Sequence, residues 1–177
     1  MAQYPSLKPF VVHGHDHAFR DAIVSYLRVD LGMDPVVLDG VASAGRTVIE
    51  KFEDESAKCN LAVVLLTPDD AALTMAGTTY MTARPNVWIE LGYFIAAFGR
   101  KSGRTLLIYK KGLDIPTDLF GVVYLDATTG FSDPDVARRL ETELNAIVSA
   151  VPSTSAPSPG PSPAQYRISG TVRLSAP

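Results

Sequence analysis

The stretch LAVVLL at residues 61–66 decides the fold class, because every one of its side chains is apolar. A strand with one face in water alternates apolar and polar residues, whereas a strand that is covered on both faces is apolar throughout. The turn-forming sequence TPDD at residues 67–70 ends the stretch. We therefore expect residues 61–66 to form the central strand of a parallel sheet that has helices on both faces.

Shorter apolar runs alternate with amphipathic segments on both sides of this strand, from residue 10 to about residue 151. Such alternation is typical of an α/β fold with a doubly wound parallel sheet, here of about five strands. The remaining strands are expected at residues 10–13, 35–38, 105–109 and 122–125. Helices are expected over residues 16–31, after a capping box formed by Thr47 and Glu50, from an N-cap at Asn86, and from Asp133.

The composition changes near residue 151, and we expect one folded domain over residues 8–151. Residues 152–165 consist almost entirely of Pro, Ser, Ala, Thr and Gly, which bury too little apolar area to fold and predict an extended linker. Residues 166–177 alternate apolar and polar side chains like a single half-buried strand. We expect this short tail either to dock as one strand or to begin a sensor domain that is missing from the sequence.

Composition and charge narrow the class of protein. With 177 residues, of which 46% are hydrophobic and 20% charged, the chain has the make-up of one globular domain. A net charge of −3 and the lack of a basic run argue against nucleic-acid binding. No apolar stretch resembles a signal peptide or is long enough to span a membrane. Cys59 is the only cysteine and is expected to be a core thiol, which fits a cytoplasmic protein.

The sequence RPNVWIELGYF at residues 84–94 places one carboxylate in an otherwise apolar helix start. Val87 and Leu91 recur at helical spacing on the core face, which leaves Glu90 on another face and directs it toward a cleft. Near the positive end of the helix dipole, Glu90 is expected to stay ionised at neutral pH. A fixed carboxylate in a partly apolar cleft suits stabilisation of a developing cation. The alternative is a solvated surface carboxylate.

Other polar candidates follow the predicted strands, and ligands of doubly wound sheets bind beyond the carboxyl ends of the strands. His13 and Gly14 end the first strand, and Asp69 follows the central strand. The sequence GRT at residues 45–47 begins a helix, so that it offers free backbone N–H groups and a guanidinium for a phosphate. A surface arginine beside a capped helix is the alternative for this sequence.

The three histidines, His13, His15 and His17, do not predict a metal site. A glycine turn and a helix start separate them, so they share no common face, and no cysteine lies nearby to complete a ligand set. Asp69 and its neighbour Asp70 are more typical of a turn than of a catalytic carboxylate pair. Residues 71–84 are rich in Thr, Ala and Gly and are a candidate lid over the carboxyl ends of the strands.

Four motifs taken together resemble a known family. They are VVHG at residues 11–14, GRTVIEKFE at 45–53, VLLTPDD at 64–70 and NVWIELGYF at 86–94. In this order they resemble the TIR-like domain of bacterial anti-phage effectors, the predicted nucleotide-binding branch found in cyclic-nucleotide-activated systems of the CBASS and Pycsar kind. The resemblance covers about residues 8–150. It implies a flavodoxin-like fold and NAD hydrolase activity, with Glu90 as the catalytic glutamate.

The resemblance makes an NAD+ glycohydrolase the leading hypothesis, with NAD as substrate and no cofactor. Nicotinamide leaves a cationic pyridinium as a neutral molecule, so one carboxylate suffices where ordinary glycosidases need two. The resemblance also implies self-association of TIR domains, and a cyclic-nucleotide sensor domain or subunit as a further partner. Besides the catalytic Glu90, the predicted substrate-binding residues are His13, Gly14, Gly45, Arg46, Thr47, Asp69, Asn86, Trp88 and Tyr93.

Two alternatives stay open. A nucleoside deoxyribosyltransferase-like enzyme would act on a different N-glycoside, and substrate profiling would separate it from an NAD hydrolase. A non-catalytic TIR module would only assemble with partners or sense a nucleotide, but such a scaffold needs neither Glu90 nor Asn86. A receiver domain is set aside, because its first strand should end in an acidic pair and this one ends in His13 and Gly14.

Overall fold

The computed structural model describes residues 4–38, 47–119 and 122–150. Its centre is a parallel sheet of four strands in the order β1-β2-β5-β6. The strands are β1 (Pro9–Val12), β2 (Leu61–Leu66), β5 (Thr105–Tyr109) and β6 (Val123–Asp126). All six residues of β2 are buried, so the apolar stretch is the central strand that the sequence predicts.

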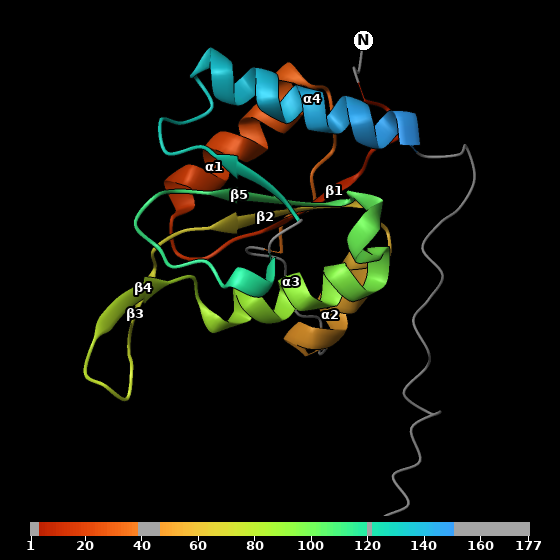
Figure 1. The fold of residues 1–177 in the computed structure, drawn as a ribbon. Helices are drawn as coiled ribbons and strands as arrows, with labels where there is room; N and C mark the ends of the chain where they lie inside the picture. The colour runs from red at the N-terminus through yellow and green to blue at the C-terminus, as the bar shows by residue number, and fades with distance from the viewer. Residues whose placement is uncertain (1–3, 39–46, 120–121, 151–177) are drawn as a thin grey trace, which may run out of the picture.

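Helices cover both faces of this sheet (Figure 1). One face carries α1 (His17–Ser25) and α4 (Pro134–Ala150), and the other carries α2 (Val48–Ser56) and α3 (Pro85–Phe98). Successive side chains of a strand point to opposite faces, so β2 contributes Leu61, Val63 and Leu65 to the first layer of core. The alternate residues Ala62, Val64 and Leu66 belong to the second layer. The structure is therefore the α/β fold that the sequence predicts.

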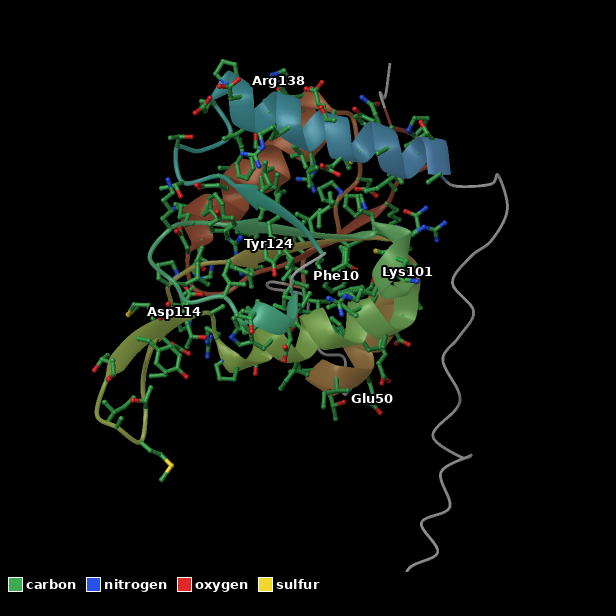
Figure 2. All side chains as sticks on the ribbon, in the orientation of Figure 1. Phe10, Glu50, Lys101, Asp114, Tyr124 and Arg138 are labelled. Atoms are coloured by element: carbon green, nitrogen blue, oxygen red, sulfur yellow. The ribbon has the colours of Figure 1, made fainter. Side chains whose placement is uncertain are left out.

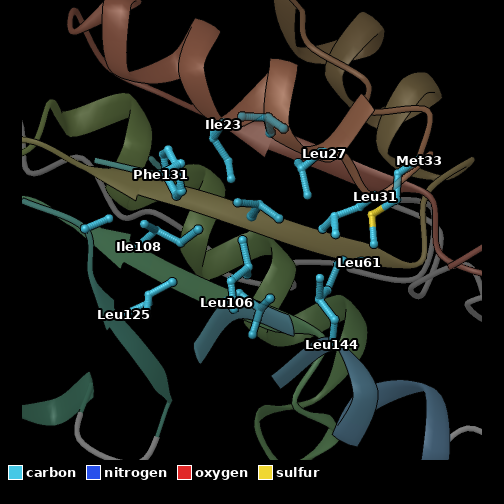
Figure 3. Packing of buried hydrophobic residues seen from close by; sticks show 14 of the residues in the cluster. Ile23, Leu27, Leu31, Met33, Leu61, Leu106, Ile108, Leu125, Phe131 and Leu144 are labelled. Atoms are coloured by element: carbon cyan, nitrogen blue, oxygen red, sulfur yellow. The ribbon is translucent and has the colours of Figure 1, made fainter. Parts of the chain in front are cut away.

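The first layer of core holds the aliphatic side chains of α1 and α4 against the sheet (Figure 3). Ile23 and Leu27 are fully buried on the α1 side, and Leu144 is fully buried on α4. The predicted helix over residues 16–31 is confirmed in extent, but its last turn, Tyr26–Asp30, is a π-helix. The wider turn is closed by the Leu31 N–H, which donates to the Tyr26 carbonyl.

The strand that the sequence predicts at residues 35–38 is reduced to one bridge between Val36 and Phe10. The Val36 N–H donates to the Pro9 carbonyl at 2.8 Å, and the Val36 carbonyl accepts from the Val11 N–H at 2.9 Å. The N–H and the carbonyl of Val36 both face β1, so the backbone of the preceding Pro35 faces away from β1. Proline has no N–H, so Pro35 presents no hydrogen-bond donor on that outer side. A short edge that ends in proline resists pairing with another strand.

Residues 71–84, expected as a lid, contain an antiparallel hairpin of β3 (Asp70–Leu73) and β4 (Thr79–Thr82). The hairpin projects from the carboxyl edge of the sheet (Figure 1). Its turn closes with the Thr74 N–H, which donates to the Thr78 carbonyl, and Gly77 takes a φ of 82° that favours glycine. Asp114 lies beside its base, where the Asp114 N–H donates to the Met81 carbonyl (Figure 2).

Several expectations fall on residues that the structure does not describe. Gly45 and Arg46, the linker at 152–165 and the tail at 166–177 all lie outside the described ranges, so their roles stay predictions. Cys59 is buried, and burial raises the pKa of its thiol to about 11, as suits a core cysteine. Within the described residues, no helix combines the length and the apolar composition needed to cross a membrane.

Candidate functional site

A cavity of about 440 Å³ lies between α2 and α3 on one side of the sheet. Glu90, Asn86 and Tyr93 share it, because residues four and three positions apart lie on one face of a helix. Three of the predicted site residues therefore meet in one place. The cavity is lined by Val48, Ile49, Phe52, Glu53, Asn86, Ile89, Glu90 and Tyr93.

The capping box that the sequence predicts fixes the start of α2, the helix on one side of the cavity. The Glu50 N–H donates to Thr47 Oγ1 at 3.2 Å, and the Thr47 N–H donates to Glu50 Oε2 at 2.7 Å. This box fixes the first residue of α2, so Val48, Ile49 and Phe52 face α3 across the cavity. Thr47 is thus the N-cap of α2, the helix that forms this wall.

Aromatic rings form the inner part of the cavity. The Phe52 and Tyr93 rings meet edge to face, with centroids 4.9 Å apart, and Phe52 also packs edge to face against Phe94. The Ser56 hydroxyl donates to the Tyr93 hydroxyl oxygen at 3.2 Å and holds this ring in place. Glu90 therefore stands next to a fixed aromatic surface.

The helix that carries Glu90 begins two residues earlier than a cap at Asn86 would allow, so that prediction is wrong. Arg84 is the N-cap and Pro85 occupies the first helical position. Proline suits this position because its φ is already helical and an N–H would be unpaired there. Asn86 then lies inside the first turn, and its amide lines the cavity instead of capping the helix.

The electrostatics of Glu90 differ from the sequence-based expectation. Burial raises the pKa of the Glu90 carboxyl to about 7, so it is partly protonated at neutral pH. The helix dipole does not prevent this, because its effect falls off within the first turn and Glu90 lies in the second. Among the described residues, no cationic side chain forms an ion pair with Glu90.

The predicted residues His13, Gly14 and Asp69 lie at the carboxyl ends of β1 and β2, outside the lining of the cavity. Asp69 Oδ2 accepts from the Thr67 hydroxyl at 2.8 Å and packs over Gly14, where an added Cβ would stand 1.8 Å from that oxygen. A larger residue in place of Gly14 would therefore force the Asp69 carboxylate to move. The His13 ring hydrogen-bonds to the Gly14 carbonyl at 2.8 Å.

Trp88 points toward the hairpin. Its indole N–H donates to Thr82 Oγ1 and to the Ala83 carbonyl, both at 3.0 Å. The side chain is half-buried against the second layer of core and does not line the cavity. Trp88 thus joins the helix that carries Glu90 to the base of the hairpin.

Sequence reasoning missed the α2 side of the cavity and Arg84. The signal for Phe52 was present, since a capping box at residues 47–50 places residues 48, 49 and 52 on neighbouring faces of the helix. Arg84 gave no such signal, because its partner His15 lies 69 residues away in the chain, with 2.6 Å between Arg84 Nη1 and His15 Nε2. Within residues 4–38, 47–119 and 122–150, no group of three His, Cys, Asp or Glu side chains could hold a metal ion.

Known proteins resemble this chain over most of the described residues. Residues 8–129 match the family described as the TIR domain of the CAP12/Pycsar effector protein. The chain is 40% identical over 122 residues to the uncharacterized protein YuaY of Escherichia coli K12, an alignment that covers 68% of this chain and 40% of YuaY. It is 32% identical over 148 residues to protein tirC of Dictyostelium discoideum, which covers 78% and 70% of the two chains.

A relative with a named role is the Pycsar effector protein PaPycTIR of Pseudomonas aeruginosa, 31% identical over 110 residues, which are 61% of this chain and 35% of the effector. A prokaryotic SEFIR domain aligns with a TM-score of 0.48 at 16% identity, over 78% of this chain and 99% of the other. The chain spans less than half the length of YuaY and of PaPycTIR. By the match over residues 8–129, the chain belongs to the TIR-domain family of CAP12/Pycsar effectors.

Proposed function

We propose that the chain is an NAD+ glycohydrolase, which cleaves the bond between nicotinamide and ribose. The observation that carries the proposal is Glu90, a half-buried carboxylate in a cavity walled by Phe52 and Tyr93, with no ion-pair partner among the described residues. A flat cationic ring suits both features, because aromatic walls pack against it and the carboxylate attracts its charge. Membership in a TIR-domain family supports the same chemistry.

Binding of a cationic ring changes the protonation of Glu90. A positive charge within a few ångströms favours the ionised carboxyl, so the raised pKa of Glu90 falls when the pyridinium enters the cavity. The carboxylate then stabilises the positive charge that develops on the ribose as the C–N bond breaks. Nicotinamide takes the bonding electron pair and leaves as a neutral molecule, so no acid is needed.

Water completes the reaction. It attacks the ribosyl carbon, forms ADP-ribose and releases one proton. Glu90 is suited to accept this proton, because a base with a pKa near 7 transfers protons efficiently at neutral pH. Asn86 lies one helical turn before Glu90 on the same cavity wall, and its amide is positioned to bind ribose hydroxyls.

The same activity would serve an effector that a cyclic nucleotide controls. Relatives of the chain are named Pycsar effectors, and about two thirds of PaPycTIR lies outside the alignment, which leaves room for a sensor. We further infer that active TIR domains associate with one another in the cytoplasm. In this chain, association would bury apolar side chains that the structure exposes around the cavity.

A non-catalytic assembly module is the second candidate function. Val48, Ile49 and Ile89 surround the cavity mouth and are 74%, 70% and 71% exposed, which favours a surface that packs against another protein. Such a module has no use for a desolvated carboxylate, which costs stability when it ionises. Turnover therefore separates the two candidates.

The test is release of nicotinamide from NAD by the purified chain, over a range of protein concentrations. We expect turnover by the native chain and a loss of at least a hundredfold in Glu90→Gln, which keeps the shape of the side chain and removes its charge. Glu143→Gln on α4, across the sheet, is the matched control and should keep full activity. No turnover at any concentration, or equal turnover in Glu90→Gln with an intact fold, would contradict the proposal. Neutral nucleosides assayed in parallel test a deoxyribosyltransferase-like activity.

A further inference from the structure

A guanidinium and an imidazole meet at the start of α3. Arg84 precedes the helix, His15 follows β1, and their atoms Nη1 and Nε2 lie 2.6 Å apart. A guanidinium only donates hydrogen bonds, so His15 accepts through Nε2 in this contact. The pair therefore carries the full positive charge of Arg84.

Nothing in the described part of the chain neutralises this charge. Arg84 is only partly exposed, and no carboxylate of the described residues forms an ion pair with it. Its Nε atom is buried and has no hydrogen-bond partner among them. The carboxylate of Asp69, at the end of the neighbouring strand, is engaged by the Thr67 hydroxyl. A partly buried charge with an unsatisfied donor costs free energy unless an anion completes it.

The local backbone strengthens the preference for an anion. Helix α3 has no side-chain cap and no acidic residue in its first turn, so the positive end of its dipole adds to the charge of Arg84. Asn86, two residues after Arg84, lines the cavity that holds Glu90. The axial distance from Arg84 to Glu90 is about 9 Å at the rise of an α-helix. An anion at Arg84 would therefore lie within the length of a dinucleotide whose base occupies the cavity.

We propose that Arg84, oriented by His15, binds the pyrophosphate of a dinucleotide whose cationic base occupies the Glu90 cavity. The inference rests on the proposed function for the identity of the base, because only a ribose separates the first phosphate of NAD from the bond to be cleaved. The guanidinium offers paired N–H donors that match phosphate oxygens. Arg84 is then a substrate-binding residue whose contact persists through the reaction.

The experiment measures binding to Glu90→Gln protein, so that turnover does not interfere. Calorimetric titrations with NAD and with inorganic pyrophosphate compare this protein with versions that also carry Arg84→Gln or Arg138→Gln. Arg138 is the matched control, an exposed arginine on α4 that pairs with Asp135 on the far side of the sheet (Figure 2). We expect Arg84→Gln to weaken NAD binding about tenfold to a hundredfold, Arg138→Gln to leave it unchanged, and pyrophosphate to compete with NAD.

Each outcome decides one proposal. Unchanged NAD affinity in Arg84→Gln, or pyrophosphate that binds without displacing NAD, overturns the role of Arg84. If the native chain releases no nicotinamide from NAD, the proposed function fails, and pyrophosphate titrations of the Glu90→Gln protein still test the anion site: binding that Arg84→Gln abolishes supports it, and no binding overturns it. Circular dichroism confirms the fold of each variant, and Arg84→Lys, which keeps the charge without the paired donors, should bind NAD with intermediate affinity.

Discussion

At the scale of single residues, burial of the Glu90 carboxyl carries a cost to stability. Its pKa of about 7 lies above the ordinary glutamate value, so the folded chain holds a proton that the unfolded chain releases as the pH rises through about 4.5 to 7. Stability is therefore lost as the pH rises through this window. Under the proposed function, a substrate cation would restore the charge of Glu90 when it binds.

The raised pKa predicts the pH dependence of turnover. Because the proposed mechanism needs the ionised carboxylate, kcat/KM for NAD should fall about tenfold per pH unit below 6 and level off above 8, with an apparent pKa near 7. The measurement is initial nicotinamide release between pH 5 and pH 9, with circular dichroism to show that the fold persists. A flat profile down to pH 5 would show that Glu90 does not titrate in this range.

We expect replacement by alanine to have opposite effects on stability at Gly14 and at Gly92. Gly14→Ala places Cβ 1.8 Å from Asp69 Oδ2, so we expect the free energy of unfolding to fall by about 1–3 kcal/mol. Gly92→Ala adds a methyl group in open space on α3, and we expect a gain of up to about 1 kcal/mol. Urea unfolding measures both. Equal shifts in the two variants would argue against the close approach of Asp69 to Gly14.

At the scale of elements, Trp88 connects α3 to the hairpin of β3 and β4. Its two hydrogen bonds satisfy Thr82 Oγ1 and the carbonyl of Ala83, which is fully buried. The indole N–H of Trp88 thus links the helix that carries Glu90 to the base of the hairpin by hydrogen bonds. A contact made by the hairpin therefore reaches the helix that carries Glu90 through Trp88.

Trp88→Phe tests this connection, because it keeps an aromatic ring and removes the N–H donor. We expect the free energy of unfolding to fall by about 1 kcal/mol and cleavage by chymotrypsin at Tyr80 to accelerate several-fold. Limited proteolysis followed by mass spectrometry locates the cut. Unchanged cleavage at Tyr80, with the expected loss of stability, would mean that the other contacts of the hairpin hold it in place.

At the scale of the whole molecule, two apolar surfaces stand exposed on the same chain. One surrounds the cavity mouth and comprises Val48, Ile49 and Ile89, and the other is the hairpin tip with Leu73 and Met75, which are 69% and 109% exposed. Both surfaces are suited to contacts between copies of the domain.

We therefore predict that specific activity rises with protein concentration. Association that completes the site makes turnover steeper than linear in protein by mass action. The double variant Leu73→Ser, Met75→Ser should reduce this steepness without changing the thermal midpoint, because neither side chain is buried. Val29→Ser, which removes an apolar side chain with 75% exposure on the π-helical turn, is the matched control. Nicotinamide release over a wide dilution series decides, and a flat specific activity would show that the monomer holds a complete site.

The sequence by itself determined the layered fold and the position of Glu90. The unbroken apolar stretch of β2 required cover on both faces, and the capping box at Thr47 set the start of α2 through local hydrogen bonds. Helical spacing alone grouped Asn86, Glu90 and Tyr93. These features depend on neighbours within one or two turns of chain, so they can be read from local pattern.

Only the tertiary structure decided the chemistry of the site. The pKa of Glu90 depends on how much water the packing of α2 against α3 removes, and the contact between Arg84 and His15 joins segments that are distant in sequence. The hairpin at residues 70–82 likewise formed where a loose lid was expected, because pairing between β3 and β4 satisfies backbone groups that the composition does not reveal. Desolvation and long-range contacts are properties of the assembled chain, and no local pattern specifies them.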